Sequence, residues 1–246
     1  VLNILCGGSD VGKSFFCLDL AVAIAEKKSE FIGFPLNVKH GKTVMVFSED
    51  SEDDVNYRLQ KLISERNLPA DSIRCWFYEG GDLRKQLEEE LASEPADLVV
   101  LDSFGDFFGK EINDSIQVRQ FFLPFKNLAK KHKCAVLFLH HVGKHKDEVL
   151  KPSKNDVLGS QGIESTSRSV MMLAKKGNNN RILTIVKGNS IDEKEKNIGF
   201  ELSFSPEEGF KRTGQVIQHS KEEIPDMTEE EEKKILEKYN ELKSLR

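Results

Sequence analysis

The sequence predicts an α/β fold: a mostly parallel central sheet with helices on both faces and antiparallel strands at its C-terminal edge. Three observations support this prediction. Short, continuously apolar runs typical of buried strands alternate with segments whose apolar residues recur at helical spacing. The alternation ends near residue 141. Beyond it, two apolar runs are joined by the tight turn Gly177 to Asn180, which is typical of an antiparallel hairpin.

Each element of the alternating part follows from its local pattern. Apolar or β-branched runs predict buried strands at Leu2 to Cys6, Thr43 to Phe47, Ile73 to Tyr78, Leu98 to Leu101 and Ala135 to Leu139. Helical spacing predicts helices at Lys13 to about Lys27, from Ser51 to Ile63, from Leu83 to Leu91 and from Val118 to Leu128. Ser51 and Asp54 resemble a capping box, and Pro124 predicts a kink or a late start in the last helix. Glycines and a proline predict a connecting loop from Ser29 to Gly41.

The C-terminal part is expected to complete the sheet. The remaining strands are predicted at Val170 to Leu173, Ile182 to Val186, Phe200 to Phe204 and Phe210 to Thr213. From Glu222 onward the sequence is rich in charge, which favours a solvated helix. We therefore expect one domain over residues 1–214 and a charged helical tail over residues 215–246.

Composition excludes several classes of protein. A chain of 246 residues with 38% apolar residues suits one domain of moderate size. No stretch approaches the ~20 apolar residues of a membrane span. The start of the chain does not resemble a signal peptide. It also lacks Met, which favours a trimmed N-terminus. The four cysteines are scattered singly, which favours free thiols in a reducing cytoplasm over a zinc site or disulfides. A net charge of -5 argues against a generally basic surface that coats nucleic acid.

Residues Gly7 to Ser14 form a complete phosphate-binding loop between an apolar strand and an apolar helix. Phosphate binding needs converging backbone amides, glycines where the chain turns tightly, and a lysine that reaches the β- and γ-oxygens. Lys13 supplies the lysine, and the Ser14 hydroxyl is placed to bind Mg²⁺. The sequence thus predicts ATP and Mg²⁺ as ligands. The predicted nucleotide-binding residues are Gly7, Gly8, Ser9, Asp10, Val11, Gly12, Lys13, Ser14 and Phe15.

Two acidic residues at strand ends are candidates for the chemistry. Phosphoryl transfer to water needs one carboxylate near Mg²⁺ and another that polarises the attacking water. Asp102 fits the first role, because strand ends in such a sheet face the ligand crevice. Glu49 ends the second strand and fits the other role, with its neighbour Asp50 as the competing candidate.

Four motifs together resemble the RecA/DnaB-like ATPases. They are the phosphate loop, Val-Met-Val-Phe-Ser-Glu-Asp, Leu-Val-Val-Leu-Asp-Ser and Leu-Phe-Leu-His-His-Val-Gly-Lys. Their order most resembles the RepA-type branch, the hexameric replicative helicases of plasmids and phages, as do Gly159 to Gly162 and the segment from Gly199 to Gly214. The resemblance covers roughly residues 1 to 214 and implies a RecA-like P-loop NTPase fold. It also implies that Glu49 is the catalytic base and that His141 senses the γ-phosphate. The adjacent His140 is expected to point into the fold instead of toward the phosphate.

The sequence departs from that family at the cationic finger, which a neighbouring subunit supplies in such rings. Lys187 matches the lysine of the family's Lys-x-Arg-like element, but Asn189 stands where its arginine is expected. An arginine finger contributes roughly 10³ to 10⁵ in rate. Either Lys187 suffices, or Arg181 or Arg168 substitutes for the arginine, or hydrolysis is weak.

The resemblance also implies that two loops face single-stranded DNA. The corresponding segments are Gly105 to Asp114 and Val142 to Asp156. The second offers Lys144, Lys146, Lys151 and Lys154 for contacts to phosphates, with a solvated surface loop as the alternative. For Phe107 and Phe108, packing against the sheet is favoured over stacking on bases. Tyr57 and Arg58 either cover the adenine or form an exposed helix flank.

The leading hypothesis from the sequence is a helicase-like ATPase that acts on single-stranded DNA as a homo-hexamer or another ring, in the cytoplasm and without a membrane segment. The first alternative is a nucleotide switch that binds ATP, assembles, hydrolyses slowly and recruits partners. A small-molecule kinase ranks below both, because no arginine-rich lid segment is present.

Overall fold

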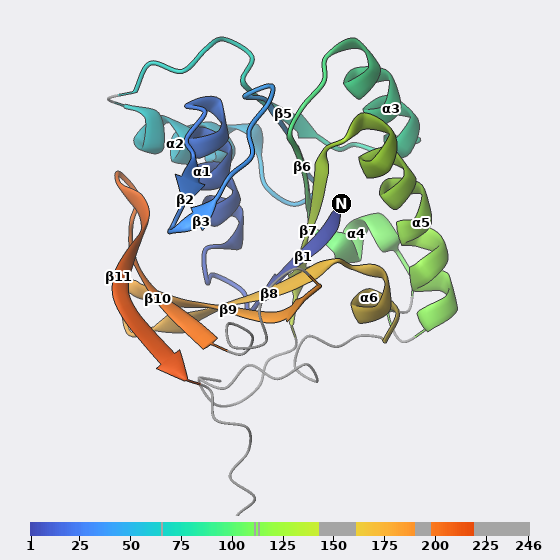
Figure 1. The fold of residues 1–246 in the computed structure, drawn as a ribbon. Coiled ribbons are helices and arrows are strands. Elements are labelled where there is room, and N and C mark those ends of the chain that lie inside the picture. The colour runs from blue at the N-terminus through green and yellow to red at the C-terminus, as the bar shows by residue number, and fades with distance from the viewer. Residues whose placement is uncertain (65, 111, 113, 143–160, 190–197, 219–246) are drawn as a thin grey trace, which may run out of the picture.

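The computed structural model describes residues 1–64, 66–110, 112, 114–142, 161–189 and 198–218 (Figure 1). The strands within these residues are β1 (Leu2–Gly7), β2 (Glu30–Phe31), β3 (Phe34–Pro35), β4 (Thr43–Phe47), β5 (Ile73–Phe77), β6 (Leu98–Asp102), β7 (Ala135–His141), β8 (Ser169–Lys176), β9 (Asn180–Gly188), β10 (Ile198–Ser205) and β11 (Gly209–Gln218). The helices are α1 (Lys13–Ala25), α2 (Glu52–Ile63), α3 (Leu83–Ser93), α4 (Phe104–Phe108), α5 (Ser115–His132) and α6 (Gln161–Thr166).

One nine-stranded sheet organises the described residues, in the order β11-β10-β9-β8-β1-β7-β6-β4-β5. The pairs from β8 through β1, β7, β6 and β4 to β5 are parallel. Strands β9, β10 and β11 extend the sheet in antiparallel fashion at the C-terminal edge. The predicted sheet architecture is therefore confirmed, including the hairpin that turns at Gly177.

Helices cover both faces of the parallel part of the sheet (Figure 1). On one face, α1 buries Phe16, Leu18 and Val22 against the strands, and α2 adds Val55 and Leu62. On the opposite face, helices α3 to α6 enclose an apolar layer that contains Phe104, Phe122 and Phe138. Strands that are buried on both faces need continuous apolar runs, which explains why β4 and β6 lack an alternating pattern.

The structure corrects the local prediction in three places. The segment predicted as a loop between Ser29 and Gly41 contains the short antiparallel pair β2–β3. Helix α5 begins at Ser115, so the late start predicted from Pro124 is wrong. The Asp114 carboxylate accepts hydrogen bonds from the amides of Ile116 and Gln117 at 3.0 Å each, which fixes the start of the helix well before the proline. Helices α4 and α6 were not predicted, because each spans less than two turns.

Other local predictions are confirmed. The Ser51 hydroxyl accepts a hydrogen bond from the Asp54 amide at 3.2 Å and caps α2. Phe108 is buried and Phe107 packs against the core, as expected for residues that pack on the sheet. His140 points into the fold, where burial lowers its pKa to about 4 and its ring makes a T-shaped contact with Phe104.

The register of the parallel strands brings the predicted site residues to one edge of the sheet. Gly7, which ends β1, lies opposite His141, which ends β7. Asp102, which ends β6, lies opposite Phe47, which ends β4 two residues before Glu49. The carboxyl ends of parallel strands are where ligands bind in open α/β sheets. The fold therefore places the phosphate loop and both acidic candidates side by side.

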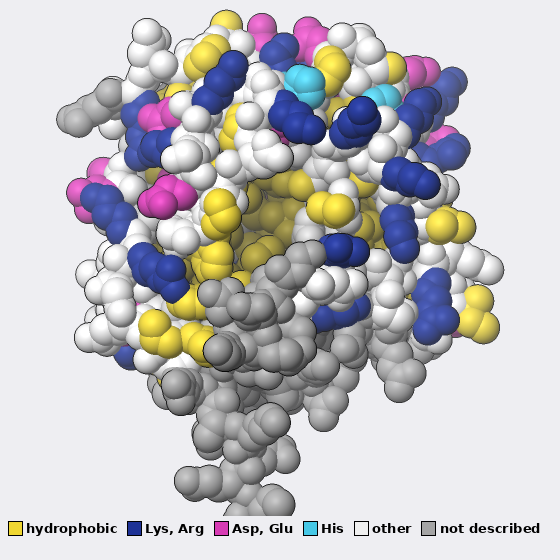
Figure 2. All heavy atoms as spheres, viewed as in Figure 1, with side chains coloured by type: hydrophobic (Ala, Val, Ile, Leu, Met, Phe, Trp, Pro, Cys, Tyr) yellow, Lys and Arg dark blue, Asp and Glu magenta, His cyan; other side chains and the backbone are white. Residues whose placement is uncertain are grey.

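The predicted domain division remains a prediction. Strand β11 continues to Gln218, beyond the expected boundary at residue 214, and residues 219–246 of the predicted tail lie outside the described residues. Within the described part of the chain, no helix has the length and apolar character required to cross a membrane. Figure 2 shows one face of the molecule, with a hollow whose floor is hydrophobic and with Lys and Arg side chains around it.

Candidate functional site

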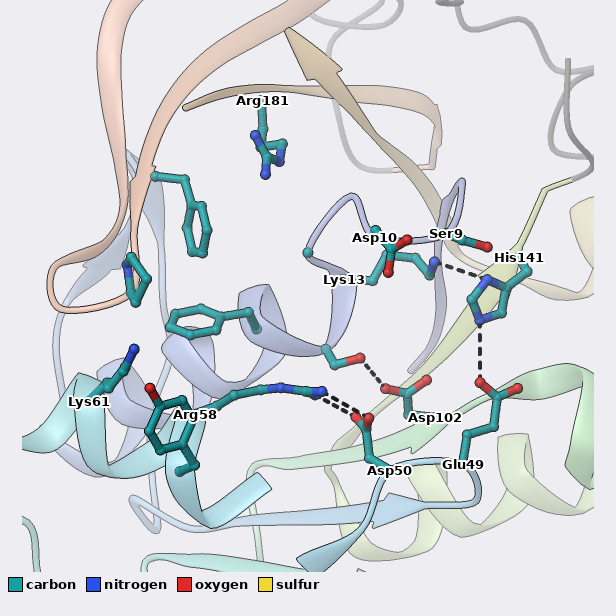
Figure 3. Close-up of a pocket in the computed structure, with 16 residues that line it drawn as sticks. Ser9, Asp10, Lys13, Glu49, Asp50, Arg58, Lys61, Asp102, His141 and Arg181 are labelled. Carbon is teal, nitrogen blue, oxygen red and sulfur yellow. Dashed lines mark hydrogen bonds and ion pairs between the residues drawn. The ribbon is translucent and has the colours of Figure 1, made fainter. Parts of the chain in front are cut away.

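A cavity of about 530 Å³ lies at the carboxyl ends of the parallel strands (Figure 3). A volume of this size lies within the usual range for a nucleotide-sized ligand. Its walls come from the phosphate loop, the ends of β4, β6 and β7, helix α2 and the turn after β10. A cavity of about 780 Å³ lies at the opposite edge of the sheet, near Val1, and contains none of the residues predicted for the nucleotide.

The phosphate loop has the backbone geometry that its sequence predicts. Gly12, the N-cap residue of α1, has a φ of 94°, a left-handed conformation that favours glycine. The Lys13 Nζ is buried and donates hydrogen bonds to the carbonyls of Gly7 at 3.1 Å and Gly8 at 2.8 Å. It also lies 3.3 Å from His141 Nδ1. Burial lowers the pKa of Lys13, and the nearby Asp102 carboxylate opposes that change.

Ser14 and Asp102 form an oxygen pair suited to Mg²⁺. The Ser14 hydroxyl donates a 2.6 Å hydrogen bond to Asp102 Oδ2. Burial raises the pKa of Asp102, whereas the bond from Ser14 lowers it. Mg²⁺ prefers oxygen ligands and is usually held by one or two protein groups together with phosphate oxygens and water. The pair fits that requirement, and the described residues contain no cluster of three or more His, Cys, Asp or Glu that would suggest another metal.

The two competing carboxylates after β4 differ in what they contact. Asp50 accepts two hydrogen bonds from the Arg58 guanidinium, at 2.6 and 3.0 Å. Glu49 has a side chain that is 61% exposed, and its Oε2 lies 4.0 Å from His141 Nε2 (Figure 3). A bidentate ion pair fixes a carboxylate and stabilises its charge, so Asp50 is poorly placed to bind water. The geometry favours Glu49 over Asp50.

A hydrogen-bond network that the sequence analysis missed joins the ends of β4 and β6. The Ser48 hydroxyl lies 2.9 Å from the Asp102 carbonyl and 2.7 Å from Asp106 Oδ2. The Ser103 amide donates to Ser48 Oγ at 3.0 Å, and the Ser103 hydroxyl donates to Asp106 at 2.8 Å. Burial opposes ionisation of Asp106, but the hydrogen bonds from Ser48 and Ser103, a hydrogen bond with Glu49 and the charge of His141 together hold its pKa below the usual range. The network ties together the two strand ends that carry Glu49 and Asp102.

The other end of the cavity is aromatic. Phe15, Tyr57, Phe204 and Pro206 line it, and Phe204 and Pro206 come from the β10–β11 hairpin. On α2, Tyr57 and Arg58 both line the cavity, where Tyr57 is 62% exposed and Arg58 is held by Asp50. Both alternatives for this pair, a cover for the adenine and an exposed helix flank, stay predictions. Arg181 donates from Nε to the Val11 carbonyl at 2.8 Å and lies over the Phe204 ring. The sequence marked Arg181 only as a substitute finger, and it gave no signal for Phe204 or Pro206.

Several predicted residues lie elsewhere. The Lys187 Nζ donates to the Ser167 carbonyl at 2.9 Å, and Lys187 does not line the nucleotide cavity of its own chain. Asn189 and Arg168 line the cavity near Val1 instead. The four predicted DNA-contacting lysines, Lys144, Lys146, Lys151 and Lys154, lie outside the described residues.

Comparison with known proteins identifies the family. Residues 1–147 match the family model described as AAA domain. The chain belongs to the AAA domain family. A sequence search finds no matching curated protein for this AAA domain.

A solved structure described as an ATPase domain is similar to this AAA domain in fold. It aligns with a TM-score of 0.64 at 12% sequence identity, over 85% of this chain and 84% of that chain. At this identity the likeness concerns the fold, and it confirms the predicted RecA-like class. Family and fold together support ATPase activity for this AAA domain.

Proposed function

We propose that this chain is a Mg²⁺-dependent ATPase of the RepA-type branch that is stimulated by single-stranded DNA and works as a helicase-like ring in replication or recombination of DNA. The observation that carries the proposal is the convergence of four groups on one cavity. Lys13, the Ser14–Asp102 pair, Glu49 and His141 come from four separate parts of the sequence and line the same space. Such convergence of phosphate, metal and water-activating groups is what ATP hydrolysis requires.

The roles of the residues follow from their positions. Lys13 and the amides of the phosphate loop hold the triphosphate, and the Lys13 Nζ exchanges its bonds to Gly7 and Gly8 for phosphate oxygens. Ser14 and Asp102 would hold Mg²⁺, which would supply positive charge to offset that of the phosphates. Glu49 orients the attacking water and accepts its proton. His141, placed between Lys13 and Glu49, contacts the γ-phosphate and reports its presence.

The ring and the DNA belong to the same proposal. Lys187 lies outside its own cavity, which fits a residue that completes the site of a neighbouring copy. Glu49 and Tyr57, which both line the cavity, have largely exposed side chains. The lysines predicted between residues 142 and 156 would contact the phosphates of single-stranded DNA. All four cysteines are free, which fits a cytoplasmic protein.

The test is steady-state ATP hydrolysis with and without a single-stranded oligonucleotide, for the parent protein and for Lys13→Ala. We expect the parent to hydrolyse ATP several-fold faster with DNA, and Lys13→Ala to be inactive in both conditions. Titration of MgATP by calorimetry provides the second readout. If the parent releases no heat on titration, the cavity is not a nucleotide site and the proposal fails.

One observation favours a second function, a slow nucleotide switch that assembles and recruits partners. Asn189 occupies the position of the expected finger arginine, and it lies in the cavity near Val1 together with Arg168. Without that arginine the ring would lose a contribution of roughly 10³ or more in rate. Under this alternative the same assay gives slow hydrolysis that single-stranded DNA leaves unchanged, while ATP binding is retained.

A further inference from the structure

Asp19 is a buried carboxylate on α1 for which neither the phosphate loop nor the proposed hydrolysis has a use. Its side chain is buried, with 5% exposed, and the phosphate loop precedes the N-terminus of its helix. Asp19 Oδ2 accepts a hydrogen bond of 2.7 Å from the backbone amide of Phe210, 191 positions further along the chain. An acidic side chain is seldom buried unless it accepts a hydrogen bond or pairs with an opposite charge. The partner here is the turn of the β10–β11 hairpin.

The shape of that turn is adapted to Asp19. Gly209 has a φ of 74°, a conformation that L-residues with side chains seldom adopt. A Cβ atom added at Gly209 would overlap the carboxylate group of Asp19. The backbone of the hairpin therefore approaches the carboxylate as closely as only a glycine permits. Asp19, Gly209 and the Phe210 amide form a clasp between α1 and the hairpin, which lie side by side in Figure 1.

The clasp holds the aromatic end of the nucleotide cavity. The Phe210 ring packs edge-on against Phe16 of α1, with ring centroids 5.1 Å apart. Phe204 stacks on Phe210 at 4.7 Å and meets Phe15 at 4.9 Å. Phe15, Phe204 and Pro206 line the cavity. The position of this wall relative to the phosphate loop is thus fixed through the segment that Asp19 binds.

We infer that Asp19 is a positioning residue for nucleotide binding: by clasping the β10–β11 hairpin to the helix of the phosphate loop, it sets the affinity of the cavity for the nucleoside part of the ligand. The inference rests on the proposed function, since it assigns the aromatic wall to the base and sugar of ATP. Under that function the phosphates are held at the other end of the cavity, by Lys13 and the amides of the phosphate loop. Loss of the clasp therefore weakens recognition of the nucleoside and leaves recognition of the phosphate chain intact.

The experiment compares two ligands by calorimetry, MgATP and Mg²⁺-tripolyphosphate, which lacks base and sugar. Asp19→Ala removes the acceptor, and we expect it to weaken MgATP binding about tenfold, the effect of losing one hydrogen bond to a charged group. The affinity for tripolyphosphate is expected to change by less than about twofold, because the substitution leaves the phosphate-binding groups at the other end of the cavity unchanged. Asp19→Asn keeps an acceptor for the Phe210 amide, so it is expected to restore most of the affinity for MgATP.

A second pair of variants tests the clasp from the hairpin side. Gly209→Ala drives a methyl group into the Asp19 carboxylate, and it is expected to weaken MgATP selectively in the same way. Gly177→Ala is the matched control, because Gly177 also has a positive φ, 64°, but no atom lies within 4 Å of its added Cβ. It is expected to bind both ligands like the parent. Since residue 19 stays aspartate in both variants, the pair decides the question even if Asp19→Ala does not fold.

The outcomes separate the two proposals. If the parent binds neither MgATP nor tripolyphosphate, the proposed function fails and takes this inference with it. If the parent binds MgATP and both Asp19→Ala and Gly209→Ala bind it equally well, only the clasp is wrong. Equal weakening of MgATP and tripolyphosphate would assign Asp19 a general structural role and would also overturn the inference.

Discussion

The two ends of the nucleotide cavity are built in different ways. The phosphate end consists of one contiguous loop and the ends of adjacent parallel strands, where Lys13 donates hydrogen bonds to loop carbonyls and Ser14 donates one to Asp102. The aromatic end joins α1 to a hairpin nearly 200 positions away, through stacked rings and one buried hydrogen bond. At the first end, backbone conformation and strand register fix the groups. At the second, side-chain packing does.

This difference has consequences for how each end responds to mutation. Hydrogen bonds to charged groups and coordination of a metal each depend on one particular atom, so a single change at the phosphate end removes a chemical function. Aromatic packing is distributed over many contacts, so a single change at the other end removes part of an affinity. We therefore expect large effects on catalysis at one end and graded effects on binding at the other.

The largest effect is expected from Glu49→Gln. The amide keeps the shape of the side chain but cannot accept the proton of the attacking water, so kcat is expected to fall by roughly 10² to 10⁴ while KM for ATP changes little. Asp50→Asn is the matched control, because Asp50 is adjacent but paired with Arg58. It is expected to retain most of the rate. Steady-state kinetics of both variants decide between the two carboxylates, and an unchanged kcat for Glu49→Gln would rule out its role as base.

The same contrast explains how much the sequence predicts. Local motifs predict the phosphate loop, Asp102 and the parallel sheet. A polar residue at the carboxyl end of a parallel strand lies at the ligand crevice, whichever strands are next to it in the sheet. His140 and His141 were separated on the resemblance alone. In β7 the residues from Val136 to His140 are all buried, and only His141, at the end of the strand, is exposed.

The aromatic end was beyond sequence reasoning. Phe204 and Pro206 carry no motif, and their place at the cavity depends on a hairpin that folds back onto α1. Asp19 lies in an almost continuously apolar helix, where it resembles an ordinary solvent-facing position. Its burial depends on a long-range contact with Phe210, which no local pattern encodes. The Ser48–Asp106 network was missed for the same reason, since it joins two strand ends through a short helix.

An intermediate effect is expected from Phe204→Ala at the aromatic end. Removing the ring opens the wall of the cavity, and we expect the Kd for MgATP to rise about tenfold, comparable to the loss of one aromatic contact. Phe200→Ala is the control, because Phe200 lies on the same strand and is buried, but it packs on Phe34 at 5.2 Å and does not line the cavity. Calorimetry on both variants gives the comparison. Equal losses in the two would mean that the strand as a whole, and not the wall, sets the affinity.

The smallest effect concerns the stability of the clasp. Burial raises the pKa of Asp19 from 3.8 to about 6, against the opposing hydrogen bond from Phe210 and the charges of Arg66 and Lys28. A carboxyl group whose pKa is raised by folding contributes stability that is fully present below its unfolded pKa and is lost as the pH rises through the folded value. The desolvation of Asp19 therefore costs more stability at pH 7, where the loss is complete, than at pH 5, where it is partial.

Asp19→Asn removes this penalty and keeps the acceptor for the Phe210 amide. Relative to the parent, the variant is expected to gain about 1 kcal/mol more free energy of unfolding at pH 7 than at pH 5. Urea denaturation at the two pH values measures this difference, and comparison within each pH cancels the titration of all other groups. A gain of the same size at both values would show that Asp19 titrates normally in the folded protein. Asp19 would then be ionised at both pH values without a net cost of burial, and the pH dependence predicted for the clasp would be wrong.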